Sequence, residues 1–395
     1  MLQMQYKTKK TPMTPQISEQ FTAIFNNKPE RIVKAPGRIN LIGEHTDYND
    51  GFVMPAAIDK AIYFASSLRT DNQFHIHALD LAENIIFTLD ELVKSEKLWA
   101  NYLIGVVAEV VKRQSISQGL NIVFSGDIPL GAGLSSSAAV ESGMVFLLNE
   151  HFSLGLSKFE MAKIAQASEH NFAGVNCGIM DMFASIFGKE NAIIQLDCRD
   201  LSFQYVDLKL SDHQILLCNT RVKHNLGDSE YNTRRAECEE GVEVLKKVFP
   251  KVKSLRDVSM AMLKSQRDAM RPIVFKRCFY VVGEEQRVKT ACESLATNNL
   301  AAFGKAMFET HDGLSQDYGV SCVELDFIVD LAKQNPAVIG SRMMGGGFGG
   351  CTINLIEKNA VEAFKETLKN KYESTFDIEP LFYEVALMDG VRSIG

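Results

Sequence analysis

Several features that would assign a protein to a class are missing from this sequence. The eight cysteines include no C-x-x-C pair, so reduced, buried thiols in a cytoplasmic protein are expected. Net charge is −7, and basic residues are concentrated only at Lys7, Lys9 and Lys10, so no nucleic-acid partner is expected. No segment approaches the apolar length of a membrane span, and the N-terminus has no apolar signal-peptide core. A soluble, cytoplasmic protein without a membrane partner is therefore predicted.

Familiar nucleotide and metal motifs are also absent. A P-loop needs GxxxxGK[ST], but no lysine lies between Gly126 and Ser137. A dinucleotide fingerprint places its glycines directly after a strand, whereas six residues, Ser125 to Leu130, separate the expected strand from Gly131. HExxH does not occur, and His45 stands alone, unlike the histidines of a metal site. These absences argue against a P-loop ATPase, a dinucleotide-dependent dehydrogenase and a histidine-based metal enzyme.

The stretch from Leu120 to Phe152 has the pattern of a strand, a glycine-rich loop and a helix. Apolar residues precede a turn through Gly126, Asp127 and Pro129, and a helical pattern begins at Ala138. Loop glycines let successive N–H groups point into one concavity, and the helix adds its unpaired N–H groups and positive dipole end. Such a loop can bind phosphate, with its serines facing the phosphate or its metal. A serine-capped helix after a turn explains the pattern equally well, so both interpretations stay open.

The length and the order of elements favour two domains. A chain of 395 residues has ample material for two buried cores. The first half is mixed α and β, with a loose arm over residues 1–16, a helix Ser18–Phe25, a strand Arg31–Ala35 and a helix Lys158–Phe172 expected. The pattern changes around Leu208–Asp212 to strands interleaved with long helices, which is typical of an α+β domain. The halves are expected to pack tightly, with a cleft between them.

The densest polar cluster lies between two hydrophobic strand patterns. It mixes carboxylates, amides, an imidazole and a guanidinium, in the order Arg38, Asn40, Glu44, His45, Asp47, Asn49 and Asp50. A solvated loop between strands would also be polar. A site that recognises several sugar hydroxyls needs this mixture of donors, acceptors and glycines for close approach.

Two more carboxylates and a last glycine loop could carry chemistry. Asp181 follows a glycine turn and begins an apolar helix, so it either stabilises the helix N-terminus or carries chemistry. Glu169 is either a surface charge or an oxygen ligand for Mg²⁺. The segment Gly345–Gly350 holds five glycines in six positions, more than a plain turn requires, and predicts a close backbone approach.

The polar cluster, the serine loop and the last glycine loop, in this order, resemble the three signature motifs of the GHMP small-molecule kinases. Residues 37–51, GRINLIGEHTDYNDG, are similar to the signature of the galactokinase family within them. The resemblance runs from about Ile32 to the final strand. It implies an α+β protein with a ribosomal-S5-like α/β domain over residues 1–208, a ferredoxin-like domain over 209–395, and a cleft between them. It also implies transfer of the ATP γ-phosphoryl to the C1 hydroxyl of D-galactose, giving galactose 1-phosphate, with Mg²⁺ as cofactor.

The resemblance further implies roles for the matching residues. Asp181 matches the catalytic acid, and Arg38 matches its transition-state partner. The residues matching the galactose site are Glu44, His45, Thr46, Asp47, Gly178 and Tyr231. Those matching the ATP phosphate site are Gly131, Ala132, Gly133, Leu134, Ser135, Ser136, Ser137, Gly346 and Gly347. Ser137 and Glu169 fall where the family places its Mg²⁺ ligands.

Two positions depart from the family pattern. Met182 follows Asp181 where glutamine is usual, which removes a hydrogen bond beside the catalytic centre. Met344 precedes the last glycine loop where threonine is usual, so phosphate contacts of this loop are expected through the backbone. Neither departure touches a charged group.

Two rival functions stay open. One is a kinase for N-acetylgalactosamine or another galactose-like sugar, because the first motif is shared among these enzymes. The other is a catalytically silent sugar sensor, in which a damaged serine loop is expected, whereas residues 133–139, GLSSSAA, are unbroken here. The expected partners are galactose and ATP, and a monomer is expected.

Overall fold

The computed structural model describes residues 13–129, 131–223 and 227–394. Residues 1–12 of the predicted arm lie outside this range. The rest of the arm prediction is wrong, because helix α1 already begins at Met13 and runs to Phe25. Pro15 is tolerated there, since the first turn of a helix leaves its N–H groups without intrahelical partners.

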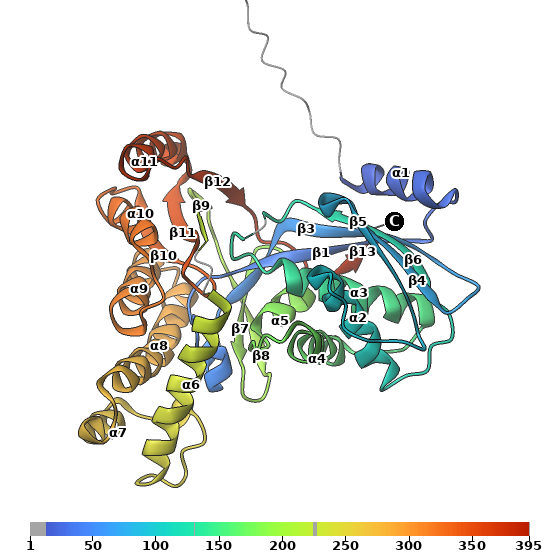
Figure 1. The fold of residues 1–395 in the computed structure, drawn as a ribbon. Helices are drawn as coiled ribbons and strands as arrows, with labels where there is room; N and C mark the ends of the chain where they lie inside the picture. The colour runs from blue at the N-terminus through green and yellow to red at the C-terminus, as the bar shows by residue number, and fades with distance from the viewer. Residues whose placement is uncertain (1–12, 130, 224–226, 395) are drawn as a thin grey trace, which may run out of the picture.

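Runs of strands and runs of helices are mixed along the described chain (Figure 1). The remaining helices are α2 Leu98–Val111, α3 Ser136–Phe152, α4 Lys158–Ser168, α5 Met180–Phe187, α6 Gly227–Lys246, α7 Met260–Ser265, α8 Pro272–Ala296, α9 Leu300–Gly313, α10 Val323–Lys333 and α11 Val361–Phe376. The strands are β1 Arg31–Asn40, β2 Phe52–Val53, β3 Pro55–Leu68, β4 Gln73–Ala78, β5 Glu83–Thr88, β6 Leu120–Gly126, β7 Ala192–Asp197, β8 Phe203–Asp207, β9 His213–Lys223, β10 Val338–Met343, β11 Gly349–Glu357, β12 Leu381–Val385 and β13 Arg392–Ser393.

A six-stranded sheet organises the first half, in the order β13-β1-β3-β6-β4-β5. Its pairs are antiparallel except β4 with β6. Helices α2 to α5 gather on one face, and α1 covers the other face by packing Ile17 and Phe21 against Ala65 and Val123 (Figure 1). The serine loop leads directly into α3 on this face of the sheet.

Strand β1 does not end at Ala35 as predicted. It continues through a bulge at Pro36 to Arg38 and pairs with β3 as far as Asn40. A proline has no N–H to give to a ladder, and a bulge removes that demand. Beyond the bulge, the Arg38 backbone N–H donates to the carbonyl of Leu134 at 3.1 Å. The bulge therefore joins the first polar motif to the serine loop.

A four-stranded antiparallel sheet, β10-β11-β9-β12, organises the second half. Helices α9, α10 and α11 lie along it, and α6, α7 and α8 extend beyond it (Figure 1). Strand β10 was not predicted. It packs tightly on α9, since a Cβ at Gly340 would lie 2.6 Å from the Cα of Gly304.

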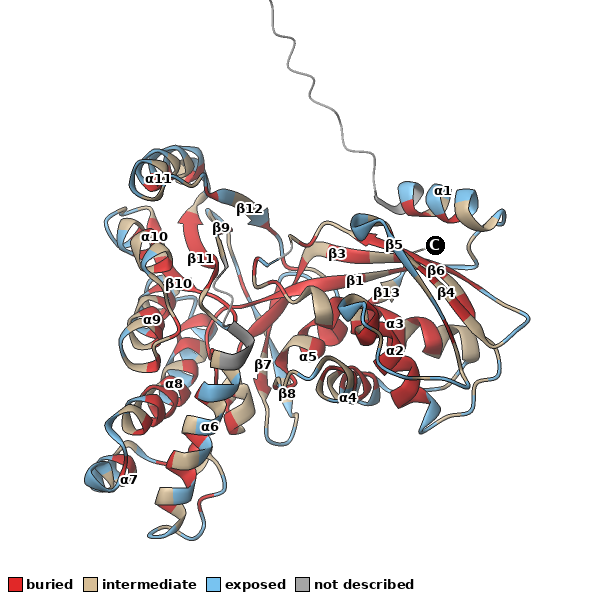
Figure 2. Ribbon diagram, viewed as in Figure 1, coloured by how far each residue is buried: buried red, intermediate tan, exposed pale blue. Residues whose placement is uncertain are grey.

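One hydrophobic cluster spans the two halves, beside further clusters within the second half. Leu217 of β9 and Ile353 of β11 belong to the same buried cluster as residues of β1 and β3. Buried residues accordingly run along β1 and β11 in Figure 2. Near the end of the chain, β13 pairs with β1 in the first sheet. The predicted tight packing is confirmed, whereas the division at residue 208 stays a prediction.

None of the helices in the described ranges has the length and apolar character needed to cross a membrane.

A buried carboxyl between the halves leads to a pH prediction. Glu285 of α8 is 6% exposed, and its Oε2 accepts from the backbone N–H of Phe52 at 3.2 Å. Burial raises the pKa of Glu285 to about 8, although Arg256 and Lys289 oppose the shift.

Because this pKa lies above the ordinary value of 4.5, the folded state holds a proton that the unfolded state releases. The free energy of unfolding should fall by up to a few kcal/mol as the pH rises from about 4.5 to about 8. Glu285→Gln should remove the part of the fall that Glu285 contributes and leave stability at pH 5 nearly unchanged, whereas Asp47 and Glu169, whose pKa values are also raised, keep their parts. Urea unfolding of the wild type and of Glu285→Gln at pH 5 and pH 8.5 measures the fall in the free energy of unfolding for each protein. An equal fall in the two proteins would contradict the raised pKa of Glu285.

Candidate active site

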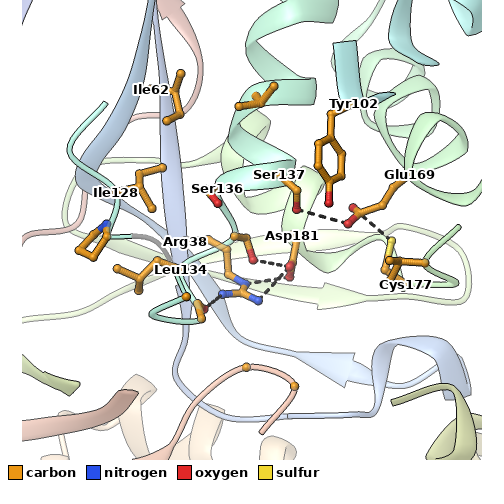
Figure 3. Close-up of a pocket in the computed structure, with 18 of the residues that line it drawn as sticks. Arg38, Ile62, Tyr102, Ile128, Leu134, Ser136, Ser137, Glu169, Cys177 and Asp181 are labelled. Atoms are coloured by element: carbon orange, nitrogen blue, oxygen red, sulfur yellow. Dashed lines mark hydrogen bonds and ion pairs between the residues drawn. The ribbon is translucent and has the colours of Figure 1, made fainter. Parts of the chain in front are cut away.

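A cavity of about 960 Å³ brings the three predicted motifs together. Its wall includes Arg38 and Asp47 from the first motif, most of the serine loop, and Gly345 to Phe348 from the last glycine loop. Figure 3 shows the serine loop, Arg38 and Asp181 facing the same space. Segments more than 300 residues apart in sequence thus contribute to one site.

Arg38 and Asp181 form a two-point ion pair in this cavity (Figure 3). Arg38 Nε donates to Asp181 Oδ1 at 2.7 Å, and Nη2 donates to Oδ2 at 2.8 Å. Ser135 Oγ also donates to Oδ2, and Arg38 Nη1 donates to the Gly133 carbonyl at 2.5 Å. Both carboxylate oxygens are engaged in these contacts, and Asp181 also lies in the first turn of α5.

The charge on Arg38 is secured by its neighbours. Burial opposes the charge, but the carboxylates of Asp181 and Glu44 raise the pKa of Arg38 above its ordinary value. A buried, fully charged guanidinium beside a carboxylate is suited to neutralising negative charge that develops in the cavity.

Glu44 is held by an arginine that sequence reasoning missed. Arg342 Nη2 donates to Glu44 Oε2 at 2.7 Å, and the backbone N–H of Gly345 donates to the same oxygen at 3.1 Å. Arg342 is fully buried, and it also donates to the carbonyls of Asn40, Leu41 and Met343. The signal was a single charge in the strand sequence VIGSRM, directly before the glycine loop.

Asp47 and Gly178 fit together as a pair. A Cβ at Gly178 would lie 1.9 Å from Asp47 Oδ2, so only glycine leaves room for this carboxylate. Burial, together with repulsion from Asp181, raises the pKa of Asp47 to about 7. Asp47 lies on the cavity wall, where its carboxyl oxygens can exchange hydrogen bonds with hydroxyl groups of a ligand.

Gly178→Ala should therefore raise the KM for the sugar by about 10-fold or more, because Asp47 must move away. The KM for ATP should change less than about 2-fold, since the phosphate loop is untouched. Gly283→Ala on α8 is the control, because its Cβ meets only the end of a flexible arginine at 3.8 Å. Steady-state kinetics with each substrate varied in turn would measure both KM values. An unchanged KM for the sugar would show that the fit between Asp47 and Gly178 does not matter for sugar binding.

His45 and Tyr231 complete the polar end of the cavity. Their rings lie 5.5 Å apart between centroids, although one belongs to the first motif and the other to α6. Burial lowers the pKa of His45 to about 4, so its ring is neutral at pH 7. Thr46 does not line the cavity: it is fully buried, and its hydroxyl donates to the carbonyls of Gly43 and Phe52 at 2.9 and 2.7 Å.

The serine loop and the last glycine loop touch backbone to backbone. A Cβ at Gly345 would lie 3.5 Å from the Cα of Gly133, and one at Gly347 would lie 2.2 Å from the carbonyl of Val320. Both of these glycines have positive φ, at 83° and 90°. The predicted close approach is confirmed. Most of residues 131–137 line the cavity, but Ala132 is buried beneath them.

Glu169 and Ser137 lie together, as Figure 3 shows. Ser137 Oγ donates to Glu169 Oε1 at 3.3 Å, and Cys177 Sγ donates to Oε2 at 3.5 Å. The predicted helix Lys158–Phe172 departs from α geometry at residue 169, where a π-helical segment Glu169–Ala173 begins. Glu169 is only 7% exposed, so its interpretation as a surface charge is wrong.

The electrostatics at Glu169 fit a bound cation. Burial and the nearby Asp181 raise the pKa of Glu169 to about 7, and the fully buried Glu141 has its pKa raised by burial and by Glu169. A divalent ion would relieve this repulsion. Within the described ranges no group of three His, Cys, Asp or Glu side chains could hold a metal.

The other end of the cavity is apolar, and sequence reasoning missed it. Ile62, Ala78, Leu81, Trp99, Phe124 and Ile128 line it. These residues come from β3, β4, β6, α2 and two connections, spread over some 65 positions, and no local pattern marks them as a site. The ladder between β4 and β6 sets Ala78 beside Phe124, and the ladder between β3 and β6 places Ile62 next to them.

Comparisons with known proteins agree with this arrangement. Residues 19–68 match the galactokinase galactose-binding signature, 101–189 the N-terminal domain of GHMP kinases, and 291–374 their C-terminal domain. The galactokinase of Clostridium acetobutylicum is 42% identical over 383 residues, covering 96% of this chain and 98% of that protein. The galactokinase of Thermotoga maritima is 41% identical over 364 residues, covering 92% and 99%.

Solved structures support the fold as well. The structure of Lactococcus lactis galactokinase complexed with galactose matches with a TM-score of 0.93 at 33% identity, covering 97% of this chain and 100% of that one. The Methanococcus jannaschii mevalonate kinase matches with a TM-score of 0.65 at 18% identity, covering 91% and 98%, and so shares the fold. The predicted two-domain α+β class is confirmed. From the motifs, the cavity and these relatives together, the chain belongs to the galactokinase family of the GHMP kinases.

Proposed function

We propose that this cavity is the active site of an ATP-dependent sugar kinase that phosphorylates the C1 hydroxyl of D-galactose. The Arg38–Asp181 pair carries the proposal, because it faces the space between the polar end of the cavity and the serine loop. A sugar hydroxyl and a terminal phosphate would meet there. Phosphoryl transfer asks mainly for in-line positioning and stabilisation of charge.

The polar end would hold galactose. Glu44 and Asp47 supply carboxylate acceptors, Tyr231 supplies a hydroxyl and an aromatic face, and His45 supplies an imidazole. Gly178 keeps space for Asp47. Thr46 would not touch the sugar. Its hydroxyl contacts two backbone carbonyls, and these contacts hold the turn that carries Glu44, His45 and Asp47.

The serine loop would hold the phosphates of ATP. Gly131 and Gly133 take positive φ values of 71° and 74°, which turns the backbone toward the cavity before helix α3 begins. The N-terminal N–H groups of that helix favour negative charge. Gly346 and Gly347 would close over the phosphates from the other loop. The apolar end beside Trp99 and Phe124 would take the adenine base.

Ser137 and Glu169 would hold Mg²⁺. The buried, mutually repelling carboxylates near them supply the negative charge that such an ion needs. When bound, Mg²⁺ neutralises charge on the phosphate oxygens. We assign no further protein ligand to it.

Asp181 would accept or orient the proton of the C1 hydroxyl. Its ion pair with Arg38 holds it in a fixed position, while Arg38 neutralises charge on the transferred phosphoryl group. The protein is further proposed to be a cytoplasmic monomer.

Phosphorus NMR of the purified protein with Mg²⁺, ATP and D-galactose tests the reaction. A new sugar 1-phosphate resonance, coupled to the anomeric proton, should grow as the ATP γ resonance disappears. Phosphate on another hydroxyl would contradict the assigned acceptor. Binding of both substrates without any new resonance would identify a silent sensor.

A further inference from the structure

His45 is the only imidazole that lines the described part of the cavity, and its two ring nitrogens have different surroundings. Nδ1 lies 2.8 Å from the hydroxyl of Tyr48. Nε2 is buried, and no group in the described part of the chain meets it with hydrogen-bond geometry. The backbone of Gly346 nevertheless acts to raise the pKa of the ring, so it favours a proton there. A neutral imidazole carries one N–H, so the placement of that proton decides what His45 offers to a ligand.

Behind His45, a chain of hydrogen bonds runs into the second half of the protein. The hydroxyls of Tyr48 and Tyr318 are 2.7 Å apart. Tyr318 is fully buried, and its hydroxyl lies 3.3 Å from Cys238 Sγ. Asn49 ends the chain, because its amide donates toward the Cys238 sulfur and, at 3.0 Å, to the His45 carbonyl.

This chain has a preferred direction. The carbonyl of His45 can only accept, so it fixes the amide nitrogen of Asn49 as the donor. With its sulfur accepting from Asn49, the Cys238 thiol has its proton free for Tyr318. Tyr318 then donates to Tyr48, and Tyr48 donates to His45 Nδ1. In the reverse direction Tyr318 would donate to the sulfur, and the described hydrogen bonds of Cys238 would leave its thiol proton without an acceptor. The Gly346 backbone, which favours a protonated ring, adds to the preference for a proton on Nε2, because Nδ1 faces Tyr48.

We propose that Tyr48, Tyr318 and Cys238 form a relay that holds His45 in its Nε2–H tautomer, so that His45 donates to a sugar hydroxyl. Tyr318 and Cys238 are positioning residues, since they act on the ligand only through Tyr48 and His45. The carboxylates of Glu44 and Asp47 would accept hydrogen bonds from the sugar, and His45 would then supply a donor on the same wall. The wall would then bind one sugar hydroxyl as a hydrogen-bond acceptor, at His45, and others as donors, at Glu44 and Asp47. The tautomer is a property of the free protein, whereas the sugar contact rests on the proposed function.

Long-range nitrogen–proton NMR of the full chain labelled with ¹⁵N-histidine tests the tautomer without any ligand. His45→Gln identifies the His45 signals by their loss. The proposal predicts an Nε2–H ring in the wild type and a mixture of tautomers in Tyr318→Phe. Tyr372→Phe is the matched control, because Tyr372 is also fully buried and donates to the Thr220 carbonyl at 3.0 Å, far from the relay. An Nδ1–H ring in the wild type, or an unchanged ring in Tyr318→Phe, would overturn the relay.

Kinetics with monodeoxygalactoses test the consequence for the sugar. Tyr318→Phe should lower kcat/KM for galactose by about 5-fold, mainly through KM, and leave it unchanged for the one deoxy sugar that lacks the partner hydroxyl. An equal loss for every sugar would show that Tyr318 is merely structural. If the protein phosphorylates no sugar, the proposed function fails, while the NMR result still decides the relay.

Discussion

Replacing Asp181 with asparagine is expected to lower kcat by about 100- to 10,000-fold, the usual contribution of a positioned acid or base. Asparagine has one acceptor oxygen, whereas Asp181 accepts two hydrogen bonds from Arg38 and one from Ser135. The variant loses the anion that accepts or orients the hydroxyl proton, and it leaves Arg38 with an amide in place of its counter-ion. Affinity for ATP should persist, because Asp181 belongs to none of the loops assigned to the phosphates.

Single-turnover kinetics and ATP titration calorimetry would measure the two effects separately. Asp197→Asn is the matched control, since Asp197 accepts from Arg256 at 2.9 Å in a partly buried pair outside the cavity. Turnover of Asp181→Asn within about 10-fold of the wild type would remove Asp181 from the chemistry. Loss of ATP binding with kcat unchanged would move it to the nucleotide site.

Arg342→Met is expected to destabilise the protein by about 3–5 kcal/mol, the range observed when one partner of a buried ion pair is removed. Arg342 is fully buried, and its guanidinium satisfies Glu44 and three backbone carbonyls. Methionine fills similar space but leaves the carboxylate of Glu44 without its hydrogen-bonded cation. Because Arg342 lies on β10 and Glu44 lies after β1, the pair also joins the two halves.

Urea unfolding of four proteins would test this account. The double variant Arg342→Met, Glu44→Gln should recover part of the lost free energy of unfolding, since no uncompensated charge remains buried. Arg271→Met is the control, because Arg271 pairs with Glu240 at the surface, where such pairs contribute about 1 kcal/mol or less. A cost for Arg342→Met no larger than that of the control would show that the pair does not hold the halves together.

The sequence predicted those parts of the site that lie in continuous motifs. Arg38, Glu44 and Asp47 follow one another within 10 positions, and the serine loop is a single run. Local patterns of glycine, charge and apolar residues therefore located them. What no pattern specified was the bulge after Pro36, which depends on pairing with β3 and sets Arg38 against the serine loop.

The remaining parts depend on long-range contacts. Strand β10 has six residues, with a glycine, a serine and an arginine among them, so its apolar pattern is weak, and Arg342 was missed with it. Glu169 could not be called buried, because its burial depends on packing far from its own helix. Tyr231 was found only through the family resemblance, and the apolar end of the cavity was not found at all. In each case the determining neighbours lie in other elements of the fold.

Release of ADP from Mg·ATP across a panel of sugars tests the central claim most directly. The panel holds galactose, N-acetylgalactosamine, glucose, mannose and arabinose, and a coupled assay compares kcat/KM for each. Turnover confined to galactose and its close deoxy analogues is predicted, because Glu44, His45 and Asp47 enclose the polar end of the cavity. A higher kcat/KM for N-acetylgalactosamine than for galactose, or no turnover of any sugar despite binding of galactose and ATP, would contradict the assignment.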